Sequence, residues 1–153
     1  MKKVLTFKIN AETYCFDVMN VVSIDQKSHV TEIPLAPPHM MGVINLRGQI
    51  IPVIDLRSLF HFSKATENRE SCSIFIETEA GRLGCIVDAV CDVIELTNGE
   101  YESVTSESVS AQSVNYIEQI LKIKEKITFL LNTNKLYDSI STINELQTTE
   151  KAA

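Results

Sequence analysis

The fold is decided by one stretch, Gly42-Val43-Ile44-Asn45-Leu46-Arg47-Gly48-Gln49-Ile50-Ile51-Pro52-Val53-Ile54-Asp55-Leu56-Arg57, which is the densest apolar run of the chain. It contains two β-rich segments, residues 43–47 and 50–54, on either side of a glycine. Because glycine adopts positive φ without steric cost, this spacing predicts a tight hairpin turn at residues 47–49. The turn would present Arg47, whose guanidinium group can bind a carboxylate or a carbonyl of a partner.

The composition is that of a globular protein. Of the 153 residues, 44% are apolar and 22% are charged, which suits one domain or two small lobes sharing a core. The formal net charge of −6 argues against nucleic acid as a partner, because phosphate binding requires concentrated Lys and Arg. No apolar run approaches the ~20 residues of a membrane span, and the N-terminus lacks an apolar signal core. We therefore expect a cytoplasmic protein with no direct membrane insertion.

Alternation of apolar and polar residues predicts an antiparallel hairpin at the N-terminus. Leu5, Phe7 and Ile9 alternate with polar residues, and residues 14–18 resume the alternation after a polar turn. A third strand is predicted at residues 21–24. Three prolines within residues 34–38 exclude a regular helix or a central strand, so we expect a stiff surface connection there.

The second half of the chain repeats this hairpin pattern. Strands are predicted at residues 72–77, 83–87, 90–96, 116–123 and 127–131, although residues 117–124 also fit a helical period. About eight to ten short strands separated by turns favour β-barrels or a β-sandwich over a parallel α/β sheet.

Two short helices and two polar connections complete the expected organisation. Asp55 is a suitable N-cap for a short helix that follows the central hairpin. Residues 132–134 can cap a final helix with apolar residues at helical spacing, namely Leu136, Tyr137, Ile140, Ile143 and Leu146. The polar residues 63–71 and 97–113 are predicted to be solvated connections.

The sequence contains no evident constellation of catalytic or metal-binding residues. The cysteines form no CxxC pair and lie far from the histidines, so we interpret all four as reduced core residues: Cys15, Cys72, Cys85 and Cys91. A pair of carboxylates could perform acid–base chemistry, but capping and strand-end roles explain the nearest candidates better, namely Asp55, Asp88 and Asp92. We therefore expect no catalytic residue, no metal and no cofactor.

Recognition surfaces are better supported than a catalytic site. Arg47 lies at a turn, where function often concentrates, although a solvated turn arginine is the plainer interpretation. Asn45 could bond a partner's backbone or could brace the turn itself. A groove at a strand edge could accept a partner helix. The residues that could line such a groove are Val21, Val22, Ile50 and Val90, and packing in the core is the alternative explanation for each of them.

Several stretches of the chain resemble a known protein family. The stretch at residues 42–57 is similar to the signature of CheW, the bacterial chemotaxis coupling protein. Residues 5–7 and 14–18 resemble the opening hairpin of that family, and residues 84–93 resemble its second-half stretch GIVVDxVxDV. Residues 127–136 resemble its closing strand and helix, so the likeness covers roughly residues 3–140.

The resemblance implies a fold and a function. The fold would be two five-stranded SH3-like β-barrels sharing an apolar core, with short helices including one at the C-terminus. The CheW-like domain would span residues 1–145, followed by a frayed tail at residues 146–153. The protein would be a non-catalytic adaptor that binds the regulatory domain of the histidine kinase CheA and the cytoplasmic tip of methyl-accepting chemoreceptors, and it would bind no nucleic acid.

The resemblance also implies partner-binding residues. Gly42, Asn45, Arg47 and Gly48 fall on the family's functional hairpin, while other positions match receptor or kinase contacts, namely Val21, Ile50, Gly84 and Val90. Ser23 is a further candidate, because the family often has Glu there. Two other departures, at Met41 and at residues 118–122, also bear on the choice of partner.

Three alternatives remain open from the sequence. A CheW-like adaptor could serve another receptor–kinase pathway, such as surface motility. A small-barrel nucleic-acid binder would need a basic, aromatic face that this acidic chain does not suggest. A hydrolase using Asp55 or His61 would need reactive neighbours that the sequence does not show.

Overall fold

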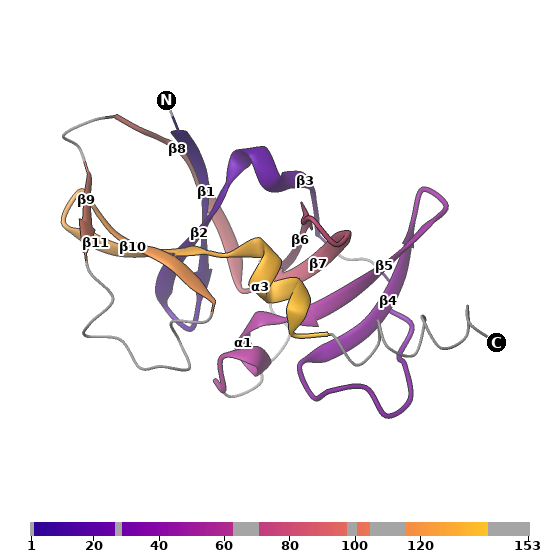
Figure 1. The fold of residues 1–153 in the computed structure, drawn as a ribbon. Helices are drawn as coiled ribbons and strands as arrows, with labels where there is room; N and C mark the ends of the chain where they lie inside the picture. The colour runs from indigo at the N-terminus through magenta and orange to yellow at the C-terminus, as the bar shows by residue number, and fades with distance from the viewer. Residues whose placement is uncertain (1, 27–28, 63–70, 98–100, 105–115, 141–153) are drawn as a thin grey trace.

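The computed structural model describes residues 2–26, 29–62, 71–97, 101–104 and 116–140, with main chain only at residues 101–104. In these residues the chain forms two β-sheets that lie side by side, with short helices beside them (Figure 1). The predicted fold class, mainly β with two sheet subdomains and a few short helices, is confirmed, but one of the two sheets has six strands rather than five, with β9 (Tyr101–Val104) at its edge.

The first sheet, here called the six-stranded sheet, has the order β8-β1-β2-β11-β10-β9. Its strands are β1 (Lys2–Ile9), β2 (Glu12–Asp17), β8 (Ala89–Leu96), β9 (Tyr101–Val104), β10 (Ile117–Ile123) and β11 (Lys126–Leu131). Its neighbours run antiparallel except for β11 and β2, which pair in parallel and join the two ends of the chain.

The second sheet, here called the five-stranded sheet, has the order β3-β6-β7-β5-β4. Its strands are β3 (Val21–Asp25), β4 (Met40–Leu46), β5 (Gln49–Asp55), β6 (Cys72–Glu77) and β7 (Arg82–Val87). Three short helices flank the sheets: the 3₁₀ helix η1 (Val18–Asn20), α1 (Leu56–Leu59) and α3 (Thr133–Asp138). No helix among the described residues is long and apolar enough to cross a membrane.

The apolar core is shared between the two sheets, as predicted. The largest buried cluster combines Phe7 and Phe16 of the six-stranded sheet with Ile54 and Ile74 of the five-stranded sheet. Each sheet also has a smaller core of its own, around Leu121 in one and around Phe75 in the other. Burial of this apolar area is the main force that holds the two sheets together.

Strand β1 is buried on both of its faces. Leu5 and Phe7 enter the shared core, while Val4 enters the core of the six-stranded sheet. Thr6 lies between them and is only 3% exposed. Its hydroxyl donates to the Asp92 carbonyl and accepts from the Asp92 N–H, both at 3.1 Å. These two bonds satisfy the buried hydroxyl, so a polar residue is tolerated at this interior position.

The predicted caps and strands agree with the structure in most places. The Asp55 side chain accepts from the Arg57 N–H at 3.0 Å and caps α1. Asn132 caps α3 by accepting from the Lys135 N–H at 3.1 Å. Residues 117–123 form strand β10, so the helical alternative for this segment is wrong. The reason is pairing with β11 along its length, which overrides an ambiguous pattern.

One expected connection contains a strand. Residues 97–113 were predicted to be a solvated connection, but Tyr101–Val104 forms β9 at the edge of the six-stranded sheet. A four-residue segment is too short to show a reliable alternation of apolar and polar residues. This strand forms because it pairs with β10 through main-chain hydrogen bonds. The rest of that connection, residues 63–70, Ile143, Leu146 and the tail at residues 146–153 lie outside the described residues.

Candidate partner-binding site

The central hairpin has the tight turn that its sequence predicts. Strands β4 and β5 pair from Met40 to Ile54, and the last pair, Leu46 with Gln49, leaves a two-residue turn of Arg47 and Gly48. Both turn residues have positive φ, 53° and 84°, which is the backbone geometry that matches the twist of a hairpin. Gln49 belongs to β5 rather than to the turn.

Asn45 braces this turn from inside the hairpin. Its side-chain oxygen accepts a hydrogen bond from the Gly48 N–H at 2.9 Å. Of the two roles considered for Asn45, the structure therefore shows the bracing role. The bond holds the left-handed backbone that projects the Arg47 side chain.

The side chains at the tip of the hairpin are open to solvent. Arg47 is exposed, and in the part of the chain that the structure describes no hydrogen bond or ion pair holds its guanidinium group. Ile50 is 60% exposed, directly across the hairpin from Asn45. On β7, Arg82 Nη1 donates to Gln49 Oε1 at 3.3 Å. The tip thus combines an available cation with an exposed branched apolar side chain.

Two of the predicted site residues are interior glycines. Gly42 has a φ of 142°, and a Cβ at this position would lie 2.0 Å from the Thr31 carbonyl oxygen. A Cβ at Gly84 would lie 2.9 Å from Phe75 Cε1 and 3.1 Å from Val53 Cγ2. The structure therefore places both glycines where backbone or core must approach closely. Any influence they have on a partner would act through the fold.

Strand β3 carries a second exposed surface at the opposite edge of the five-stranded sheet from β4. Val21 and Ser23 are half-buried, and Val21 packs against the shared core. The side chains that reach solvent are Met19 at 87%, Val22 at 37% and Ile24 at 46%. We call these three residues the β3 apolar row. Met19 and Ile24 were missed in the sequence analysis. The signal available for Ile24 was the alternation of Val22 and Ile24 around the polar Ser23.

The last predicted site residue lies in the other sheet. Val90 is half-buried on β8 and packs against the shared core. Val93, three residues further along the same edge strand, is 60% exposed and was missed in the sequence analysis. The predicted residues therefore do not form one patch. Asn45, Arg47, Gly48 and Ile50 come together at the hairpin tip, while the rest belong to the interior, to β3 or to β8.

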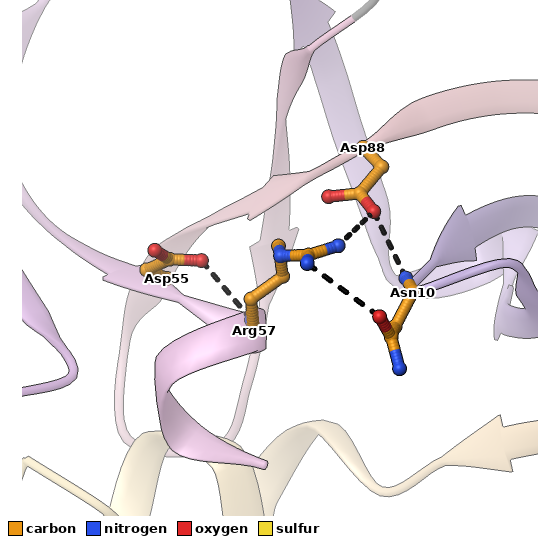
Figure 2. Close-up of polar contacts among 4 residues, drawn as sticks. All are labelled: Asn10, Asp55, Arg57 and Asp88. Carbon is orange, nitrogen blue, oxygen red and sulfur yellow. Dashed lines mark hydrogen bonds and ion pairs between the residues drawn. The ribbon is translucent and has the colours of Figure 1, made fainter. Parts of the chain in front are cut away.

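The acidic residues near the strands hold the structure together (Figure 2). Burial raises the pKa of the Asp55 carboxyl, although the N–H groups of Arg57 and Ser58 oppose that shift. Asp88 Oδ2 lies 2.6 Å from Arg57 Nη1 and accepts from the Asn10 N–H at 2.9 Å. Asp55 caps a helix and Asp88 stands between two strands, as predicted. The strand-end role expected for Asp92 is wrong, because Asp92 lies inside β8, where its main chain pairs with the Thr6 hydroxyl.

Other ionisable groups show no convergent chemistry. Burial raises the pKa of Tyr14 and of Cys15 to about 12, and it also raises the pKa of Cys85. Cys91 is exposed, so the expectation of four core cysteines is wrong for this residue; it sits on the edge strand β8, where one face meets solvent. Among the residues that the structure covers, no cluster of His, Cys, Asp and Glu is arranged to hold a metal ion.

Comparison with known proteins gives consistent results. A family model described as a CheW-like domain matches residues 3–141. The chemotaxis protein CheW of Bacillus subtilis (strain 168) is 34% identical over 140 residues, which cover 92% of this chain and 89% of the relative. The chemotaxis protein CheW of Thermotoga maritima is 29% identical, with 91% and 89% of the two chains covered.

A solved structure also matches. It is the crystal structure of the scaffolding protein TtCheW from Thermoanaerobacter tengcongensis, with a TM-score of 0.79 and 32% sequence identity. The match covers 87% of this chain and 90% of that chain. The hairpin, the two sheets and the matches along nearly the whole chain lead to one conclusion: this chain belongs to the CheW-like domain family.

Proposed function

We propose that this chain is a non-catalytic chemotaxis scaffold that couples chemoreceptors to the histidine kinase CheA. One partner would be the regulatory domain of the kinase, and the other would be the cytoplasmic tip of a methyl-accepting chemoreceptor. The observation that carries the proposal is the exposed Arg47 on a braced, two-residue turn, in a chain of the CheW-like family. A scaffold of this kind acts by biasing a partner's conformational population, so it needs binding surfaces and no reactive groups.

The exposed surfaces support two separate binding faces. The hairpin tip offers Arg47 and Ile50, and the β3 apolar row lies at the far edge of the same sheet. An arginine beside an exposed apolar side chain is the composition that binding hot spots favour. Exposed apolar side chains on an edge strand suit the docking of a partner helix or strand. Two faces on one body are what a receptor–kinase scaffold requires.

The test is to replace Arg47 in a reconstituted mixture of receptor fragment, kinase and this protein. Arg47→Ala should weaken receptor-dependent kinase activation by about fivefold or more, because it removes a recognition cation worth about 1–3 kcal/mol. Arg47→Glu should weaken it further by reversing the charge. The fold should be unchanged in both variants, since the guanidinium group forms no hydrogen bond or ion pair in the described residues.

A matched control is Lys135→Ala, which removes an exposed positive charge from α3, away from the hairpin. Its activation should equal that of the unaltered protein. Full kinase activation by the Arg47→Glu variant would contradict the role that we give to the hairpin. Absence of binding to both partners by the unaltered protein would contradict the proposed function as a whole.

A further inference from the structure

The two sheets are joined by a polar contact that is distinct from the exposed faces. It involves Asn10, Arg57 and Asp88, which we call the inter-sheet clamp (Figure 2). Asn10 lies in the turn between β1 and β2 of the six-stranded sheet, and Arg57 lies on α1, directly after β5 of the five-stranded sheet. Asp88 is the single residue between β7 and β8, where the chain crosses from one sheet to the other.

The clamp is short and partly shielded from water. Arg57 Nη1 and Asp88 Oδ2 are 2.6 Å apart, and the two side chains are only 14% and 19% exposed. The same Asp88 oxygen accepts from the Asn10 N–H at 2.9 Å, while Arg57 Nη2 lies 3.5 Å from Asn10 Oδ1. Charge-assisted hydrogen bonds of this length are directional and stronger than neutral ones.

Each member of the clamp is also fixed by its main chain. The Asp88 N–H donates to the Lys8 carbonyl of β1 at 3.0 Å, so the crossing residue is tied to the six-stranded sheet. The Arg57 main-chain N–H donates to Asp55 Oδ1, which fixes the backbone of Arg57 at the end of β5. Asn10 has a φ of 51°, the left-handed geometry of a tight turn. The clamp therefore connects two backbones that are each anchored by hydrogen bonds.

Apolar burial is non-directional, so a core can tolerate small sliding of one layer on another. Directional hydrogen bonds between an anchored cation and an anchored carboxylate restrict that sliding. Among the described residues, the clamp is a contact between the sheets that has this property.

We propose that Asn10, Arg57 and Asp88 are positioning residues that fix the orientation of the five-stranded sheet relative to the six-stranded sheet. In this way the hairpin tip and the exposed edge of β8 behave as one rigid body. The hairpin tip and the β3 apolar row share one sheet, so their relation does not require the clamp. Resting on the proposed function, the inference is that coupling of receptor to kinase also uses the exposed edge of β8, which carries Val93 and whose place relative to the hairpin tip depends on the clamp. Binding of each partner by itself does not depend on the clamp, because Asn10, Arg57 and Asp88 lie outside both the hairpin tip and the β3 apolar row.

The first test measures the orientation directly. Spin labels are placed at Thr31→Cys, an exposed residue bonded to β4 of the five-stranded sheet, and at Lys126→Cys, an exposed residue of the six-stranded sheet. Cys72 and Cys91 are replaced by serine so that labelling is specific. The distance distribution should broaden by about twofold in Asp88→Asn, because the residual amide cannot form the ion pair. Arg57→Lys keeps the charge but loses the second donor, and it should give a smaller broadening.

The matched control is Lys122→Gln. Lys122 Nζ lies 3.6 Å from Glu125 Oε2, so this variant removes an ion pair that is confined to the six-stranded sheet. Its distance distribution should match that of the unaltered protein. If Asp88→Asn does not fold, Arg57→Lys still tests the ion pair. Asn10→Gly preserves the left-handed turn and the main-chain bond to Asp88, so it tests only the 3.5 Å contact between Asn10 Oδ1 and Arg57 Nη2.

The second test separates coupling from binding. In Asp88→Asn, receptor-dependent kinase activation should fall by about tenfold, while the Kd for each isolated partner stays within about twofold of the unaltered protein. A narrow, unchanged distance distribution in a folded Asp88→Asn variant would overturn the orienting role. Full activation together with a broadened distribution would overturn the coupling role. If the unaltered protein bound neither partner, the proposed function and the coupling role would both fail, and the distance measurement would still decide whether the clamp sets the angle.

Discussion

Gly42 and Gly48 lie in the same hairpin and both have positive φ, yet alanine should affect them very differently. At Gly42 the new Cβ would lie 2.0 Å from the Thr31 carbonyl oxygen, a main-chain atom that cannot rotate away. At Gly48 nothing lies within 4 Å of the new Cβ. We predict that Gly42→Ala strongly destabilises the protein and that Gly48→Ala is tolerated.

The magnitude follows from the contacts that must be given up. To relieve the clash, the segment at Thr31 must move away from β4, which breaks the two main-chain bonds between Thr31 and Val43 at 2.8 and 2.9 Å. Each bond contributes about 1 kcal/mol net. An alanine at a φ of 142° adds about 1–3 kcal/mol of backbone strain. The expected loss in free energy of unfolding is therefore about 3–5 kcal/mol for Gly42→Ala, against about 1–2 kcal/mol for Gly48→Ala, which has strain alone.

The assay is urea denaturation followed by far-ultraviolet circular dichroism, since the chain contains no tryptophan to report by fluorescence. A loss of about 3–5 kcal/mol is a large share of the 5–15 kcal/mol that stabilises a typical domain, so it is easily measured. The reasoning is refuted if Gly42→Ala unfolds within about 1 kcal/mol of the unaltered protein, or if Gly48→Ala is equally damaging. If this result is obtained, a loss of partner binding on substitution of Gly42 must be attributed to destabilisation of the fold, not to a lost contact with the partner.

Three further predictions concern the turn, a cap and the thiols. Asn45→Ala should lower the free energy of unfolding by about 0.5–1.5 kcal/mol in the same assay, because the Gly48 N–H loses its acceptor, whereas Asn45→Asp should retain stability. Burial raises the pKa of the Asp55 carboxyl in the folded state above its ordinary 3.8. Between the unfolded-state and folded-state pKa values the folded protein therefore binds more protons, and the stability due to this group falls as the pH rises through that interval. Asp55→Asn should gain stability relative to the unaltered protein across the same interval, and parallel pH profiles of the two proteins would contradict this. At about pH 8, Cys91 should react with a disulfide reagent well before the two thiols whose pKa burial raises, Cys15 and Cys85, and equal rates would contradict their burial.

The parts of the fold that were predictable are those with a local signal. The central hairpin follows from Gly48 between two β-rich segments, and the caps at Asp55 and Asn132 follow from their side chains preceding a change of period. The hairpin at β1 and β2 follows from alternation around a polar turn. In each case the residues that interact are within a few positions of each other, so the pattern contains the information.

The parts that were missed depend on distant pairing. Strand β9 is formed by its hydrogen bonds to β10, not by its own pattern. Thr6 is buried because Asp92, 86 residues away in sequence, satisfies its hydroxyl. Cys91 was expected in the core but lies exposed at the edge of a sheet, a position that only the strand order reveals.

For the candidate site, the sequence by itself determined the exposed arginine and the turn that holds it, because turn chemistry is local. Only the tertiary structure showed that Gly42 and Gly84 are interior, and that β3 and β4 occupy opposite edges of one sheet. The contacts from Asn10 and Arg57 to Asp88 span 78 and 31 residues of sequence. No local pattern encodes such contacts, because they exist only after burial of the shared core has brought the two sheets together.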